Sequence, residues 1–110
     1  MSPLSPRDVV WTEFPYTDMT KTKWRPALVL ARLSDTDYLM RQLTSKPYGT
    51  HFIDLGDGDF EWGRLEATRA ANPKKIFSLH RELMEEKPCG RLGRKRFEHI
   101  LEAIREYLDS

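Results

Sequence analysis

The segment KTKWRPALVLARL, Lys21–Leu33, passes from a basic stretch directly into an apolar run. A continuous apolar run of this length, rich in Leu and Val, predicts a strand buried on both faces over Pro26–Leu33. Proline is tolerated at the first position of such a strand, and it restricts Arg25 to an extended conformation. The sequence therefore predicts an arginine held at the rim of a sheet. Three interpretations of this arginine stay open: a solvent-exposed loop residue, a salt-bridge partner, or a planar hydrogen-bond donor to phosphate.

Other short segments carry strand or turn patterns. Strands are predicted over Asp8–Phe14, Tyr38–Ser45, His51–Leu55 and Lys74–Leu79, with Tyr38–Ser45 as the hairpin partner of the central run. Gly56–Gly63, GDGDFEWG, is expected to be an acidic turn region. The pattern of Arg64–Ala71 fits either a helix or a strand.

The last part of the chain changes period. Its apolar residues recur at helical spacing and predict a helix over Arg94–Leu108. These are Phe97, Ile100, Leu101, Ile104 and Leu108, all expected in the core. Strands followed by one helix predict a mostly β, small antiparallel domain with a packed terminal helix. At 110 residues, one domain over residues 1–110 is expected.

Composition narrows the class of protein. Charged residues make up 32%, apolar residues 39%, and the net charge is +1, which suits a globular chain and gives no whole-molecule signal for nucleic acid. Cys89 is the only cysteine, so an internal disulfide is excluded. No apolar run is long enough to span a bilayer, and the N-terminus lacks a signal-peptide core. A cytoplasmic protein with no membrane association is expected.

Motifs for metal and nucleotide chemistry are missing from the sequence. His51, His80 and His99 lie at no ligand spacing, and there is no P-loop or dinucleotide fingerprint. The expectation is therefore no metal and no cofactor. Cleavage of RNA fits these limits, because the substrate supplies its own 2′-hydroxyl nucleophile and the protein only positions it, moves protons and stabilises charge. Simple binding fits them equally.

Three segments in this order resemble one known family. DVVWTEFPYTDMTKTKWRPALVL, YLMRQLTSKPY and KKIFSLHRELMEEKPCGRL resemble the PemK/MazF-like toxins of type II toxin–antitoxin systems, over roughly residues 7 to 108. The resemblance implies an SH3-like β-barrel with a C-terminal helix. It also implies a homodimer, metal-independent endoribonuclease activity on single-stranded RNA, and inhibition by a cognate antitoxin. Operator DNA would be contacted only indirectly, through the antitoxin complex.

The family's site residues transfer in part. Arg25 matches the active-site arginine, Thr44 the threonine beside it, and Ser45 its neighbour. Some members carry an Arg-x-Asp pair where this chain has Asn72 and Lys74, and a histidine before the arginine that this chain lacks. The proton-transfer partner is therefore left open between His51, Arg69 and a substrate-bound water.

Basic and aromatic residues near these positions are candidate RNA contacts. The alternative is that the basic residues are solvated surface and the aromatic residues are half-buried packing. They are Lys21, Lys23, Trp24, Lys46, Tyr48, His51, Arg69, Lys74 and Lys75. Two other functions stay open. One is a catalytically weak or inactive barrel that binds RNA, DNA or a protein partner, for which the departures at Asn72 and Lys74 would be the mark. The other is a purely structural dimerisation module.

Overall fold

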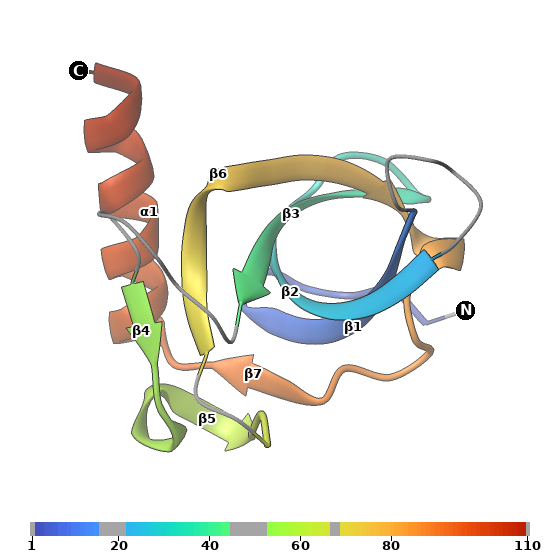
Figure 1. Ribbon diagram of the computed structural model, residues 1–110, viewed down its shortest axis with the longest axis horizontal. Helices are drawn as coiled ribbons and strands as arrows, with labels where there is room; N and C mark the ends of the chain where they lie inside the picture. The colour runs from blue at the N-terminus through green and yellow to red at the C-terminus, as the bar shows by residue number, and fades with distance from the viewer. Residues whose placement is uncertain (1, 16–21, 45–52, 67–68, 110) are drawn as a thin grey trace.

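The computed structural model describes residues 2–15, 22–44, 53–66 and 69–109, with the side chains of residues 14, 15, 22 and 72–74 excepted (Figure 1). Its strands are β1 (Asp8–Pro15), β2 (Thr22–Arg32), β3 (Asp37–Thr44), β4 (Ile53–Leu55), β5 (Phe60–Gly63), β6 (Arg69–His80) and β7 (Gly90–Leu92). Two 3-10 turns, η1 (Asp57–Asp59) and η2 (Arg81–Leu83), and one helix, α1 (Arg94–Asp109), complete the described elements.

The strands form one sheet in the order β4-β6-β3-β2-β1-β7-β5, and each pairing among the described strands is antiparallel. The sheet curls, so that β1, β2, β3 and the long bent β6 surround a common axis (Figure 1). Helix α1 stands beside β4 and the bend of β6. The prediction of a mostly β, barrel-like antiparallel fold with one terminal helix is confirmed.

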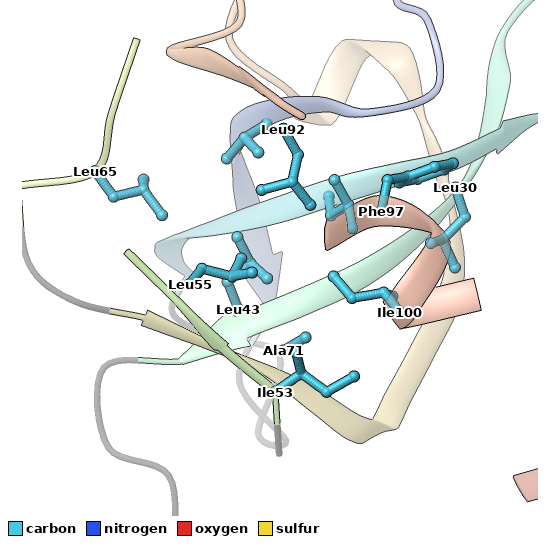
Figure 2. Close-up of a cluster of buried hydrophobic side chains, with 11 residues drawn as sticks. Leu30, Leu43, Ile53, Leu55, Leu65, Ala71, Leu92, Phe97 and Ile100 are labelled. Atoms are coloured by element: carbon cyan, nitrogen blue, oxygen red, sulfur yellow. The ribbon is translucent and has the colours of Figure 1, made fainter. Parts of the chain in front are cut away.

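Side chains of the central strands alternate between two apolar clusters, one on each face of the sheet. The first, here called the helix-side cluster, contains Phe97 and Ile100 of α1 together with strand residues (Figure 2). Its strand and loop members are Val9, Leu28, Leu30, Leu43, Ile53, Leu55, Leu65, Ala71 and Leu92. The second, here called the opposite-face cluster, comprises Leu4, Val10, Ala27, Val29, Tyr38, Met40 and Met84. Both faces of β2 are therefore buried, as its apolar run predicts.

Proline does not begin β2, contrary to expectation. The strand starts at Thr22 and ends at Arg32, so Pro26 is internal to it. Pairing with β1 runs through Pro26, whereas pairing with β3 begins only at Ala27. Pro26 thus lies just before the part of β2 that pairs with β3. A residue without an N–H is tolerated at such a position.

The segment expected to be an acidic turn contains a strand. Only Asp57–Asp59 forms a turn, and Phe60–Gly63 is β5, which pairs with the short β7 that the sequence did not reveal. Gly63 has φ +72° and its backbone lies against Cys89 and Gly90, where a Cβ would clash with backbone atoms. Glycine is therefore required at this close approach. The pattern of Arg64–Ala71 fitted either a helix or a strand. The end of this segment is a strand, because β6 begins at Arg69.

Helix α1 has the predicted bounds within one residue, Arg94–Asp109. Its last turn does not join the core, however. Leu108 is 76% exposed, so the expectation that this leucine is buried is wrong. The helix extends past the sheet it packs on (Figure 1), and its apolar period continues beyond the surface available to cover it. Across the described residues, no helix combines the length and the apolar character needed to cross a membrane.

A buried arginine ties the N-terminal segment to the loop after η2. Arg81 is 3% exposed and its guanidinium donates to the carbonyl oxygens of Ser2, Glu85 and Glu86 at 3.2, 2.7 and 2.6 Å. We expect Arg81→Ala to lower the free energy of unfolding by about 1–3 kcal/mol, because it removes three part-buried hydrogen bonds from a charged donor. Arg81→Lys should recover only part of this loss, since an ammonium cannot reach three diverging acceptors. Urea unfolding of the three proteins would contradict this role if all had equal midpoints.

Candidate functional site

Arg25 lies on β2, half-buried, next to Thr12 of β1 in the sheet register. The Thr12 hydroxyl is fully buried and donates to the Arg25 carbonyl oxygen at 2.9 Å, which fixes the backbone at this position. Strand alternation places the Arg25 side chain on the face of Ala27 and Val29, that of the opposite-face cluster. The extended backbone predicted for Arg25 is thus present, although Pro26 does not begin the strand.

Thr44 is the last residue of β3 and pairs with Ala70 of β6. The β2–β3 register joins Ala27 to Gln42, Leu28 to Arg41 and Val29 to Met40. This ladder ends at the Ala27–Gln42 pair, and strand alternation puts Arg25 on the face of Ala27 and Thr44 on the face of Gln42, which is the same face of the sheet. Guanidinium and hydroxyl groups can both donate hydrogen bonds to phosphate oxygens. Ser45, the third predicted residue, lies outside the described residues.

Trp24 lies on the other face. It pairs with Glu13 of β1 and shares the side of Pro26 and Trp11, which packs against the helix-side cluster. Its side chain is 46% exposed. Because adjacent strand residues point in opposite directions, Trp24 and Arg25 lie on either side of β2 rather than flanking one surface.

The basic candidates also divide between the faces. Lys23 is exposed and follows the alternation of Arg25, and Lys75 is exposed on the face of Phe77 in the opposite-face cluster. Arg69 is half-buried, and its guanidinium carbon lies 5.5 Å from the ring centroid of Trp11, a cation–π contact on the helix-side face. The structure thus separates Arg69 from the Arg25 and Thr44 side of the sheet.

Several predicted contacts fall outside the described residues. They are Lys21, Lys46, Tyr48 and His51, and for Lys74 and Asn72 the side chains. Their roles stay predictions. In the part of the chain that the structure describes, no group of three metal-ligating side chains converges. Two surface hollows, of about 420 and 540 Å³, lie by the β4–β5 turn and at the start of α1, and neither is lined by Arg25 or Thr44.

Arg41 was not identified as a candidate from the sequence. Among the described residues it has the largest fully buried side chain, and the residue is 1% exposed. It lies between Leu28 and Ile76 on the helix-side face. Desolvation by burial lowers the pKa of Arg41 to about 10, which still leaves it charged at neutral pH. The alternation of YLMRQLT, with Leu on either side of Arg41 at two-residue spacing, was the signal that it shares the buried face. Burial likewise raises the pKa of the Cys89 thiol.

Comparison with known proteins identifies the family of the chain. No curated protein matches the chain significantly. A family model described as the PemK-like, MazF-like toxin of type II toxin-antitoxin systems matches residues 5–108, nearly the whole chain. The match spans the strands that carry Arg25 and Thr44 as well as helix α1, and it confirms the resemblance seen in the sequence motifs. The chain therefore belongs to the PemK-like, MazF-like toxin family of type II toxin–antitoxin systems.

Proposed function

We propose that this protein is a metal-independent endoribonuclease that cleaves single-stranded RNA and is held inactive by a cognate antitoxin. Family membership supports the class of activity, which is general among these toxins. The observation that carries the proposal to particular residues is the β2–β3 register, which brings Arg25 and Thr44 to one face of the sheet. Arginine at such a position suits a phosphate whose charge grows during the reaction.

In the proposed reaction the 2′-hydroxyl oxygen attacks the adjacent phosphorus and the bond to the 5′-oxygen breaks. The products are a 2′,3′-cyclic phosphate and a 5′-hydroxyl. The 2′-hydroxyl loses a proton and the leaving oxygen gains one, so the two transfers balance. The Arg25 guanidinium would donate to the non-bridging phosphate oxygens, and Thr44, with Ser45, would hold the phosphate or orient the 2′-hydroxyl. Of the three candidates for the proton acceptor, Arg69 lies on the other face, which leaves His51 and a substrate-bound water.

The remaining expectations from the family belong to the same proposal. They are a single domain, a homodimer, a location in the cytoplasm, and contact with operator DNA only through the antitoxin complex. An acidic antitoxin segment would compete with RNA for the face that carries Lys23, Arg25 and Lys75, because the two ligands offer the same sign of charge.

Incubation of the purified protein with a long single-stranded RNA tests the activity. Cleavage should persist in EDTA and yield a 2′,3′-cyclic phosphate or its 3′-phosphate opening product. Replacing the ribose before the cut by 2′-deoxyribose should abolish cleavage at that position, because it removes the nucleophile. Loss of activity in EDTA, or cleavage of the deoxy-substituted site, would contradict the mechanism.

The second candidate function is RNA binding without cleavage, and the departures at Asn72 and Lys74 favour it. A gel shift with the same RNA distinguishes the two. Binding that weakens steeply with salt, because phosphate contacts release counterions, but that leaves the RNA intact would select this second function.

A further inference from the structure

Thr12 places a hydroxyl inside an apolar part of the sheet. The residue is fully buried, and strand alternation puts its side chain on the face of Val10, a member of the opposite-face cluster. Valine suits a strand position of this kind, because it has the same shape as threonine and no polar group to satisfy. Buried hydroxyl groups in proteins have hydrogen-bond partners. The partner of this hydroxyl therefore indicates why a threonine is present.

That partner belongs to Arg25. The Thr12 hydroxyl donates to the carbonyl oxygen of Arg25 at 2.9 Å. The two residues are also directly opposite each other in the β1–β2 ladder, so their side chains are neighbours on one face of the sheet. Thr12 therefore restrains Arg25 in two ways. Its hydroxyl holds the backbone, and its branched side chain, which is stiff at χ1, limits the directions open to the aliphatic stem of the arginine.

The strand that carries Thr12 is held on its other side as well. Thr12 forms an isolated antiparallel bridge with Met84, and the Glu85 N–H donates to the Trp11 carbonyl oxygen at 3.0 Å. The buried Arg81 guanidinium in turn donates to the Glu85 carbonyl oxygen at 2.7 Å. This part of β1 is thus fixed between β2 and the segment that Arg81 holds, and the Thr12 hydroxyl extends the restraint to Arg25.

We propose that Thr12 is a positioning residue for RNA cleavage, which holds the Arg25 guanidinium in the direction that suits the phosphate. This inference rests on the proposed function and adds a residue to it. Thr12 has no exposed surface, so RNA cannot reach its hydroxyl and its effect has to pass through Arg25. A long, flexible side chain loses conformational entropy when it is ordered, and a donor that is already oriented stabilises growing charge without reorganisation.

Two conservative substitutions separate positioning from packing. Thr12→Val keeps the branched shape and removes the hydroxyl, whereas Thr12→Ser keeps the hydroxyl and removes a methyl group. Thr12→Val should lower kcat for RNA cleavage roughly 2- to 10-fold, the equivalent of one hydrogen bond, with KM unchanged. Thr12→Ser should stay closer to the wild-type rate. A packing role gives the reverse order, because valine fills the site and serine leaves a gap, and that reverse order would overturn the inference.

The effect should disappear when the arginine is absent. In a double-mutant cycle, Thr12→Val should change the residual single-turnover rate of Arg25→Ala by less than about twofold, since the group that Thr12 positions is gone. An equal fold-loss in both backgrounds would refute action through Arg25.

Val10→Ala is the matched control, because Val10 is fully buried on the same strand and face but pairs with Ala27. It should lower the melting temperature and leave kcat unchanged where the protein is folded. A loss of kcat equal to that of Thr12→Val would refute a specific role for the hydroxyl.

The guanidinium can also be followed without catalysis, by nitrogen-15 NMR. The Arg25 Nε–H signal is identified by its absence in Arg25→Lys. Its heteronuclear NOE should fall in Thr12→Val but not in Thr12→Ser, because only the first loses the restraint. The Nε–H signal of Arg32, at the other end of β2, should be unchanged in both. If wild type cleaves RNA and the Arg25 signal is the same in all three proteins, the inference fails alone. If wild type cleaves no RNA, the proposed function fails and the inference fails with it.

Discussion

Replacing Arg25 by alanine is expected to lower the rate of RNA cleavage by roughly 10²–10³-fold, or about 3–4 kcal/mol of transition-state stabilisation, by analogy with the loss of one oxyanion donor. The guanidinium would meet charge that grows on the phosphate only as the reaction proceeds, so the loss should fall on kcat. Stability should change little, because Arg25 is only half-buried and its carbonyl keeps the Thr12 hydrogen bond whatever the side chain. Single-turnover cleavage assays with parallel thermal melts measure both effects.

A second arginine on the same strand controls for loss of positive charge. Arg32 ends β2, has an exposed side chain and pairs with Asp35 at 3.4 Å. Arg32→Ala should cleave as wild type does. Arg25→Lys should recover little activity, since a point charge cannot reproduce the two-pronged donor, and Thr44→Ala should show a smaller loss than Arg25→Ala. Equal cleavage by Arg25→Ala and Arg32→Ala, both folded, would refute the assignment of Arg25.

The largest expected effect on stability is in helix α1. Ile100 is fully buried in the helix-side cluster, and Ile100→Ala should lower the free energy of unfolding by about 2–5 kcal/mol through lost burial and the cavity left behind. That is a large share of the roughly 5–15 kcal/mol that stabilises a typical domain. Chemical denaturation followed by far-ultraviolet circular dichroism measures the change in midpoint.

Leu108 is the matched control, because it has the same number of side-chain carbons on the same helix but is 76% exposed. Leu108→Ala should shift the unfolding free energy by no more than about 0.5 kcal/mol. A comparable loss in both variants would mean that the end of α1 is covered in solution, as by a second copy of the chain. The pair of substitutions therefore also reports on association.

The parts of the fold that could be predicted are those whose apolar residues follow a clear pattern along the sequence. The apolar run of β2 and the helical spacing of α1 each determine an element in a single way, and both are present. The strand β5 was hidden because FEWG is short and follows glycines and aspartates that are typical of turns. It forms because β7, thirty residues later in the chain, offers it a partner, and such a long-range pairing leaves no local pattern.

The candidate site, like the fold, could be predicted only in part. Arg25 and Thr44 came from a motif, and strand alternation puts both on one face of the sheet. The division between Trp24 and Arg25 follows from strand alternation alone, but only once β2 is known to begin at Thr22 rather than Pro26. With Trp24 in a loop its direction would be undetermined. The contact of Arg69 with Trp11 depends on the curl of the sheet, which no local pattern encodes.

The composition of the helix-side cluster has a consequence for synthesis. Leu92, Phe97 and Ile100 follow all the strands from β1 to β6 in the chain, so they leave the ribosome after those strands. Until then the nascent chain holds Arg25 and Thr44 on strands whose apolar face is still uncovered. Translation would thus complete the fold late, which leaves an interval in which a protease meets an unfinished chain rather than a folded one.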